Sequence, residues 1–111
     1  MTRSSGILLP VSALPGPCGI GDLGTAAREF IDFLAAAGQR CWQILPLNPP
    51  DSAHSPYLSA STFAGSTDLL SPEPFMARGV LTASEVRSVD WGGDPMRVDY
   101  GRVHAGKTAL W

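Results

Sequence analysis

Two short apolar runs and one amphipathic stretch dominate the hydrophobic pattern of this sequence. The first run covers residues 6–11 and is followed by Pro15-Gly16-Pro17, and the second covers residues 40–45 and stops at Pro46. Between them, residues 25–37 carry apolar side chains at the three- and four-residue spacing that lines one helix face. These side chains are Ala27, Phe30, Ile31, Leu34 and Ala37. The pattern predicts a buried strand at 6–11, a helix at 25–37 and a second strand at 40–45.

The order strand, helix, strand at these lengths is typical of a βαβ unit. Such a unit has parallel strands and a right-handed crossover. Gly24 or Thr25 can cap the start of the helix, and Gly38 can adopt the left-handed conformation that ends it. The predicted fold class is therefore α/β.

A long stretch of loop composition follows the second predicted strand, over residues 46–68. Loops longer than about 12–15 residues within compact folds are usually functional. Residues 51–65 read D-S-A-H-S-P-Y-L-S-A-S-T-F-A-G, which sets Tyr57 and Phe63 among small residues. A packed element would show periodic apolar residues, and a disordered linker would not carry these aromatics. We predict a ligand-facing loop.

Short helices are expected over the remaining residues, 71–111. Ser71-Pro72-Glu73-Pro74 is typical of a cap and first helical turn, with Gly79 as the stop. Thr82-Ala83-Ser84-Glu85 has the pattern of a capping box. Asp99 can cap a last helix that carries Val103 and Leu110 on one side.

The end of the chain indicates an incomplete domain. The last predicted helix stops at Trp111, a large aromatic residue, with no finished element after it. Two parallel strands and a few short helices also cannot cover both faces of a parallel sheet, as such sheets require. Charged residues make up only 16% of the chain, below the roughly 25% of ordinary soluble domains. We therefore expect the tail to be truncated and much of the surface to be covered by missing parts.

One motif suggests a nucleotide site but lacks its context. Residues 19–24 match G-x-G-x-x-G at the start of the predicted helix. A dinucleotide fold places this motif directly after the first strand, with an acidic residue about 20 positions on. Here residues 12–18 intervene, and the first acid after the second strand, Asp51, comes too late. We interpret the motif as a tight turn and expect no cofactor, which leaves a nucleotide-dependent enzyme as a weak alternative.

Charge and cysteine usage exclude several other classes. The net charge is −2 and Lys107 is the only lysine, so nucleic acid is not an expected partner. No apolar run approaches the roughly 18 residues of a membrane helix. Cys18 and Cys41 lack a C-x-x-C motif or a histidine cluster, so we expect reduced thiols and no metal site. Pro10 and Ser12 interrupt the only leader-like run, and we expect a cytoplasmic protein.

Four stretches carry a resemblance to a known enzyme family. They are S-G-I-L-L-P (5–10), L-P-G-P-C-G-I-G-D-L-G (14–24), F-I-D-F-L-A-A-A-G-Q-R-C-W-Q-I-L-P-L (30–47) and S-P-Y-L-S-A-S-T-F-A-G (55–65). Their order and spacing resemble the amylomaltases, the 4-α-glucanotransferases of glycoside hydrolase family 77. Leu58 departs from the family pattern, which usually has Gln there.

The resemblance implies a fold and a reaction. The chain would be the N-terminal βαβ portion of a TIM (β/α)8 barrel, incomplete here because the remainder of the barrel is missing. Loops after barrel strands form the active face, which would make residues 46–68 a substrate loop. The family transfers α-1,4-glucan segments between maltooligosaccharides by a retaining mechanism, with an aspartate nucleophile and a glutamate acid/base about 5–5.5 Å apart.

The family's catalytic carboxylates lie past the end of this chain, so we assign no catalytic residue and expect the chain alone to be inactive. Local acids match none of them and have ordinary explanations as solvated helix residues, loop flanks or turn residues. The acids considered are Asp22, Glu29, Asp32, Asp51, Asp68, Asp90, Asp94 and Asp99.

Substrate binding is what the resemblance leaves to this chain. Tyr57 would lay its ring on a glucose, and Pro56 would fix the turn that aims Tyr57. Ser55 would donate to or accept from a sugar hydroxyl or a catalytic neighbour. Without the resemblance, a loop tyrosine more often simply packs. We expect His54 to be a surface histidine without a partner and Trp42 to lie in the core. The alternative is a non-catalytic glucan-binding module that uses the same loop.

Overall fold

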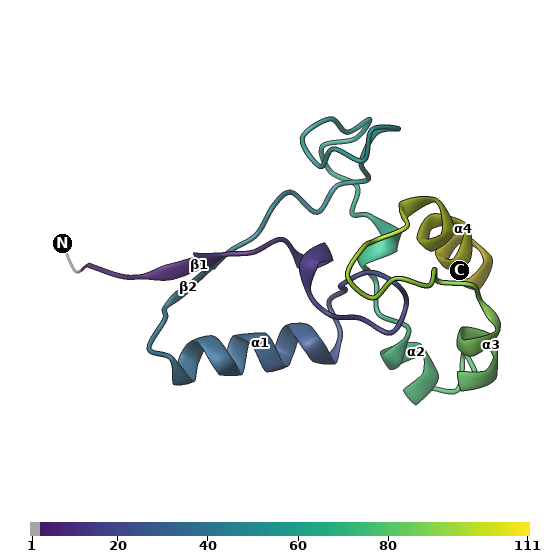
Figure 1. The fold of residues 1–111 in the computed structure, drawn as a ribbon, viewed down its shortest axis with the longest axis horizontal. Helices are drawn as coiled ribbons and strands as arrows, with labels where there is room; N and C mark the ends of the chain where they lie inside the picture. Colours follow the sequence, from purple (N-terminus) through teal and green to yellow (C-terminus); the bar gives the residue numbers. More distant parts are fainter. Residues whose placement is uncertain (1–2) are drawn as a thin grey trace.

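A parallel pair of short strands and one helix form one end of the molecule. In the computed structural model, which describes residues 3–111, β1 (Gly6–Leu8) pairs with β2 (Cys41–Gln43) so that Ile7 lies opposite Trp42. Helix α1 (Thr25–Ala36) joins the two strands and runs alongside them (Figure 1). The predicted βαβ unit is confirmed.

Both strands are shorter than the predicted 6–11 and 40–45. The Leu9 N–H still donates to the Gln43 carbonyl at 3.0 Å, but Pro10 has no N–H to continue the ladder. The chain then enters the 3₁₀ turn η1 (Val11–Ala13). Because β1 ends there, residues 44–45 have no partner strand and β2 ends as well.

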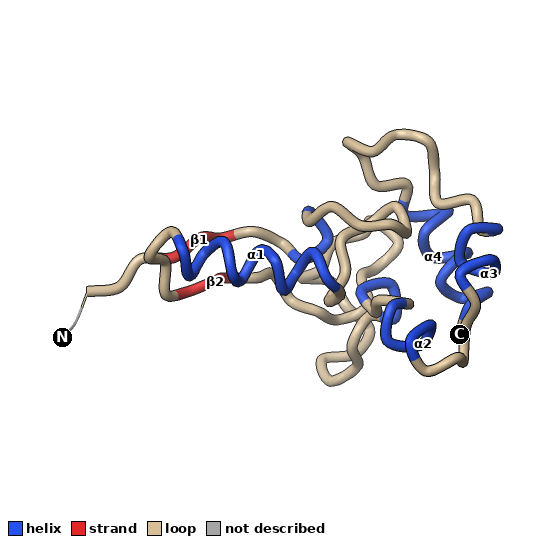
Figure 2. The backbone as a smooth tube through the Cα atoms, turned by 90° about the horizontal axis from the view of Figure 1, so that it is seen from below, coloured by secondary structure: helices blue, strands red, loops and turns tan. Residues whose placement is uncertain are grey.

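The prediction that the strands are buried is wrong for this chain. Ile7 is 42% and Leu8 57% exposed. Within the described residues the sheet has two strands, and Figures 1 and 2 show α1 running along them on one side. A two-stranded sheet with one covering helix leaves its second face open, which is why apolar strand residues remain exposed.

The start of α1 is capped from a distant element. Gly24 occupies the N-cap position and offers no side chain. Instead, Glu73, the first residue of α2 (Glu73–Ala77), accepts from the Thr25 N–H at 2.8 Å and from the Thr25 hydroxyl at 2.7 Å. A carboxylate at this position satisfies free N–H groups and complements the helix dipole. Gly38, with φ of +73°, follows the helix end as predicted.

Trp42 links α1 to the first strand. Its indole ring meets Phe30 of α1 edge-on, with centroids 5.0 Å apart, and its Nε1–H donates to the Leu9 carbonyl at 2.8 Å. Trp42 is half-buried, so the predicted core position is only partly realised in the described chain.

The core sits at the opposite end, where η1, the 19–24 turn and the last helix meet. Figure 1 shows α2, α3 (Ala83–Ser88) and α4 (Tyr100–Leu110) gathered there. The most buried apolar side chains there are Val11, Leu14, Cys18, Ile20, Val86 and Val103, and α1 adds the buried side chains of Ala27 and Leu34. These residues come from segments far apart in the sequence, so this end depends on tertiary packing.

The predicted caps of α3 and α4 are confirmed, whereas α2 has Pro72 at its N-cap and no side-chain cap. Thr82 and Glu85 form a reciprocal capping box at α3, with the Thr82 N–H donating to Glu85 at 2.7 Å and the Glu85 N–H donating to the Thr82 hydroxyl at 3.2 Å. Donation from the Thr82 N–H, and then from its hydroxyl, lowers the pKa of Glu85. Asp99 accepts from the Arg102 N–H at 3.1 Å at the start of α4.

The G-x-G-x-x-G stretch is a tight turn packed against η1. A side chain at Gly21 would overlap the carbonyl oxygens of Val11 and Leu14. Asp22 Oδ1 accepts from the Gly24 N–H at 2.9 Å. Asp22 is only 3% exposed, which corrects the expectation of a solvated acid beside α1; its partner, Lys107, comes from α4.

Candidate functional site

The predicted substrate loop projects from the body of the molecule. It leaves β2, rises above the other elements in Figure 1, and returns to the 3₁₀ turn η2 (Thr67–Leu69). Its base is closed by the Ser66 N–H, which donates to the Leu47 carbonyl at 2.7 Å. The two ends of the loop between β2 and η2 are therefore joined by a backbone hydrogen bond.

Asn48 holds the inside of the loop. Its Nδ2 group lies 2.9 Å from the Ser61 carbonyl, 2.7 Å from that of Thr62 and 3.2 Å from that of Ala64. The Asn48 side chain thus holds residues 61–64, near the end of the loop, against the start of the loop. Sequence reasoning missed Asn48, although asparagine in a loop is a residue that often bonds nearby backbone.

Asp51 organises the turn that leads to the predicted sugar-binding residues. Its Oδ1 accepts from the N–H groups of Ala53 and Ser55, both at 3.1 Å, and its carbonyl accepts from the His54 N–H at 2.9 Å. His54 has φ of +59°, the one positive value for a non-glycine residue in the described chain. The turn sets the direction in which Ser55, Pro56 and Tyr57 leave it.

The three predicted sugar-binding residues occupy different surroundings. Ser55 and Pro56 are half-buried, whereas Tyr57 is 70% exposed. Leu58 and Phe63 are also exposed on the same loop. Tyr57 is therefore free to meet a ligand from outside, and the prediction of its role in binding is neither confirmed nor contradicted by its position.

A cavity of about 190 Å³ lies beneath the loop, where the chain leaves β1 and β2. Pro56 is the predicted site residue that lines it, and Asp68 and Tyr100 face it from η2 and α4. The remaining lining is largely apolar: Pro10, Val11, Ser12, Ile20, Leu45, Pro46, Leu47, Asn48, Pro50, His54, Ser66 and Leu69. Clefts at the carboxyl ends of parallel strands are common ligand sites in α/β folds.

Asp68, beside the base of the loop, has an ionisable side chain as its partner. Asp68 is 8% exposed, and both its oxygens lie 3.2 Å from His104 Nδ1. Among residues 3–111, no cluster of three or more His, Cys, Asp or Glu side chains could hold a metal ion. Both cysteines are free thiols as predicted, and burial raises the pKa of Cys18.

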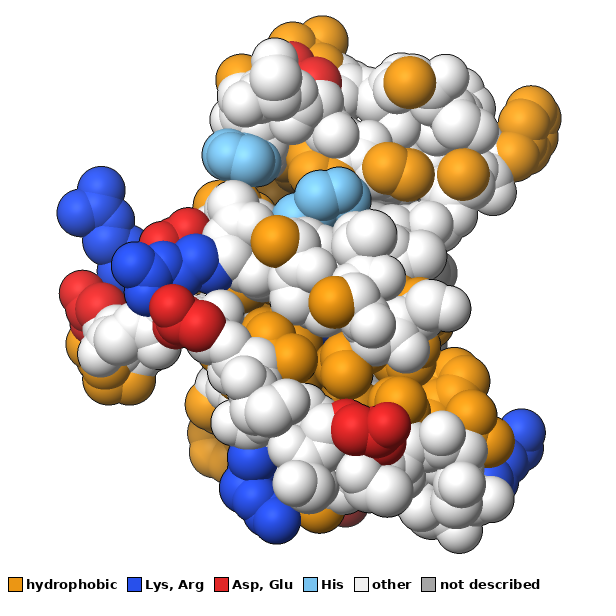
Figure 3. Space-filling model, turned by 90° about the vertical axis from the view of Figure 1, so that its right-hand side faces the viewer, with side chains coloured by type: hydrophobic (Ala, Val, Ile, Leu, Met, Phe, Trp, Pro, Cys, Tyr) orange, Lys and Arg blue, Asp and Glu red, His pale blue; other side chains and the backbone are white. Residues whose placement is uncertain are grey.

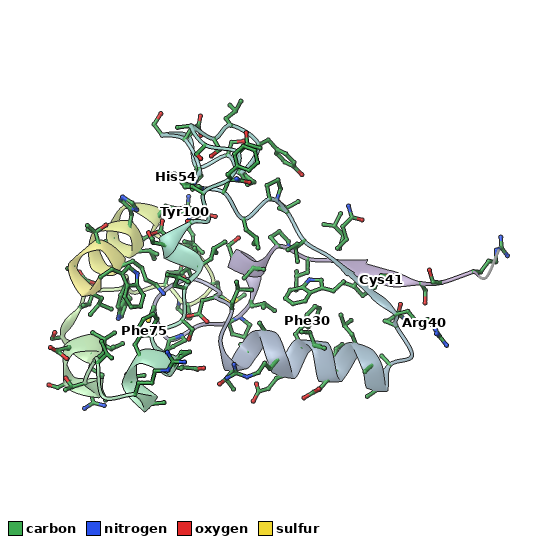
Figure 4. All side chains as sticks on the ribbon, turned by 180° about the vertical axis from the view of Figure 1, so that it is seen from behind. Phe30, Arg40, Cys41, His54, Phe75 and Tyr100 are labelled. Carbon is green, nitrogen blue, oxygen red and sulfur yellow. The ribbon has the colours of Figure 1, made fainter. Side chains whose placement is uncertain are left out.

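His54 has a partner that the sequence did not reveal. It is exposed, as predicted, but its ring stacks on the Tyr100 ring with centroids 4.6 Å apart and planes 13° apart. Figure 4 shows the two side chains meeting between the loop and α4. In Figure 3 the two histidines, in pale blue, lie near each other on one face, consistent with a second cavity that both His54 and His104 line.

Comparison with known proteins decides the family. Residues 9–111 match the sequence profile of the 4-alpha-glucanotransferases, glycoside hydrolase family 77. The chain belongs to this family. The resemblance drawn from the four sequence stretches is thereby confirmed.

Two curated 4-alpha-glucanotransferases give the extent of the similarity. The Thermus thermophilus protein is 46% identical over 107 residues, which cover 96% of this chain and 20% of that protein. The Streptococcus pneumoniae serotype 4 protein is 43% identical over 108 residues, covering 97% of this chain and 21% of that protein. The chain thus spans about a fifth of the length of these relatives.

The solved amylomaltase of Streptococcus agalactiae in complex with acarbose is similar in three dimensions. It superposes with a TM-score of 0.87 at 34% sequence identity, over 98% of this chain and 23% of the amylomaltase. The described fold is therefore that of the matching portion of an amylomaltase. No helix within residues 3–111 has the length and apolar character needed to span a bilayer.

Proposed function

We propose that this chain contributes the first βαβ unit and a substrate loop to a retaining 4-α-glucanotransferase with a TIM (β/α)8 barrel. The observation that carries the proposal is the superposition of 98% of the chain on an amylomaltase that was solved with acarbose. The position of residues 46–68 after β2 supports it, because loops after barrel strands form the active face. A cytoplasmic location remains a prediction from the sequence.

The proposed ligand is an α-1,4-glucan or maltooligosaccharide held by Ser55, Pro56 and Tyr57. The exposed ring of Tyr57 can lie against the apolar face of a glucose while its hydroxyl stays in water. The Ser55 hydroxyl can exchange hydrogen bonds with a sugar hydroxyl. Pro56 restricts the backbone between them, and the Asp51 turn holds the Ser55 N–H in place.

The bond-breaking groups are proposed to come from the remainder of the barrel. Retaining transfer needs a carboxylate nucleophile and a carboxylic acid about 5–5.5 Å apart on either side of the bond. The two buried acids here are already engaged, Asp22 with Lys107 and Asp68 with His104. We therefore expect the 111-residue chain alone not to transfer glucose.

A chimera tests the proposal. Residues 1–111 of this chain replace the matching segment of the Thermus thermophilus 4-alpha-glucanotransferase, and release of glucose and longer products from maltotriose is followed. We expect transfer by the chimera, and a loss of about 10-fold in kcat/KM on Tyr57→Ala, the equivalent of one aromatic contact. Tyr57→Phe retains the ring and should retain most of the activity.

Controls separate binding from folding. Val80→Ala changes an exposed side chain after α2, remote from the loop, and should leave both kinetics and melting temperature unchanged. Unchanged maltotriose kinetics in Tyr57→Ala would remove Tyr57 from the site. A folded chimera that binds maltodextrin through Tyr57 but transfers nothing would replace the transferase by the glucan-binding module.

A further inference from the structure

The loop that carries Tyr57 has hydrogen bonds between its own residues but none of them reaches the rest of the described molecule. Within the described chain, every hydrogen bond made by residues 48–65 ends inside 48–65. The tie at its base, between Leu47 and Ser66, joins the two ends of the loop but does not fix its tilt. Something else must set the direction in which the loop stands.

An aromatic stack crosses from this loop to α4. The rings of His54 and Tyr100 lie 4.6 Å apart and nearly parallel, at 13° (Figure 4). His54 reaches this position with φ of +59°, a conformation that costs free energy for a non-glycine residue and persists where its surroundings hold it. The N–H groups of His54 and Ser55 both donate to Asp51, so one turn holds His54 and Ser55, and Ser55 is two residues from Tyr57 along the chain.

Tyr100 belongs to a helix that is packed firmly into the core. It is the first residue of α4, whose start is capped by Asp99. One turn on, Val103 is completely buried, and Lys107 is buried against Asp22 and the Leu70 carbonyl. The Tyr100 ring is therefore held in a fixed position by α4, and a loop residue that stacks on it takes a defined position as well.

We propose that Tyr100 is a positioning residue of the sugar-binding site, which acts through His54 to orient the loop bearing Tyr57. The inference rests on the proposed function and adds the residue that holds the loop in its binding orientation. Without the stack, the loop spends part of its time in other orientations, and apparent affinity falls with the fraction that is competent to bind. Saturating substrate restores the competent state, so KM rises and kcat is retained.

The test uses the chimera with substitutions on both sides of the stack. Tyr100→Leu removes the ring, and His54→Asn removes the partner ring while tolerating the positive φ. We expect each to raise the KM for maltotriose about 2- to 12-fold, the range that corresponds to one aromatic pair. Hydrogen exchange over residues 48–65 should be faster in both, and the double variant should be no worse than either single one. Tyr100→Phe keeps the ring and should restore a low KM.

The chain offers a matched control in a second aromatic pair. Phe75 of α2 lies 4.8 Å from Trp111, measured between ring centroids, away from the loop. Phe75→Leu should lower the melting temperature without changing KM or exchange in the loop. If Tyr100→Leu behaves like this control, with a lower melting temperature and unchanged KM, its role is merely structural and the inference is overturned.

The two proposals fail in different ways. If Tyr57→Ala impairs transfer while Tyr100→Leu and His54→Asn change neither KM nor loop exchange, the positioning role is overturned and the proposed function stands. If Tyr57→Ala has no effect on transfer, the proposed sugar-binding role fails, and with it the positioning inference.

Discussion

Lys107 Nζ lies 3.8 Å from Asp22 Oδ2 in the interior, and this pair joins α4 to the turn at residues 19–24. Lys107 is fully buried and Asp22 is 3% exposed. Lys107 also donates to the Leu70 carbonyl, whereas Asp22 Oδ2 has no hydrogen-bond partner in the described chain. The attraction of Lys107 is thus what compensates for burying this oxygen.

Removing the cation alone should be more harmful than removing both charges. Lys107→Met leaves the Asp22 carboxylate buried and unpaired, which costs about 3–5 kcal/mol of unfolding free energy. The double variant Asp22→Asn/Lys107→Met leaves no buried charge and should recover much of that loss. Thermal unfolding of the chimera measures both. Equal losses of unfolding free energy in the single and double variants would show that the attraction between the two charges does not stabilise the fold.

The stability of the protein should depend on the ionisation of Asp22. Burial raises the pKa of Asp22 above its ordinary 3.8, although Lys107 and the Gly24 N–H act in the opposite direction. The folded state therefore holds this proton more tightly than the unfolded state. As pH rises from about 3.8 through the folded pKa, the Asp22 contribution to stability falls.

Asp22→Asn isolates this contribution, because asparagine does not titrate. We expect the melting temperature of the Asn variant, minus that of the unsubstituted chimera, to increase as pH rises through that window. A difference that decreases over the same window would mean that the folded state lowers the pKa instead.

The donor group of Asn48 should be essential to the order of the loop. Asn48→Ala removes the donor to three carbonyls near the end of the loop. We expect faster hydrogen exchange over residues 48–65. We also expect the KM for maltotriose to rise by about 3-fold or more, because a side-chain hydrogen bond contributes about 1 kcal/mol. Asn48→Asp is the matched control, because aspartate has the same shape but no N–H donor when ionised. Retention of slow exchange in the Asp variant would contradict the role of the donor.

Local features of the fold followed from the sequence. Helix α1 was predicted at 25–37 and is observed at Thr25–Ala36, and the capping box at Thr82 and the cap at Asp99 form as predicted. These features depend on spacing and hydrogen bonds within a few residues, which the local sequence specifies. The strand lengths did not follow, because a strand extends only as far as its partner, and Pro10 ended the ladder early.

At the candidate site, the sequence predicted the loop and, through the family resemblance, a binding role for Ser55, Pro56 and Tyr57. It did not identify how they are held. Asn48 was overlooked, His54 was expected to have no partner, and Asp22 was expected to lie in solvent. The cap of α1 likewise comes from Glu73, 48 residues from Thr25.

By itself, the sequence determined the family, the order of the helices and strands and the position of the long loop after β2, because those rest on local pattern and motif spacing. Only the tertiary structure decided which distant side chains meet: His54 with Tyr100, Asp22 with Lys107, Asp68 with His104. The physical reason is that such pairs form when the chain folds back on itself. Their free energy depends on burial and orientation, which no local pattern of residues specifies.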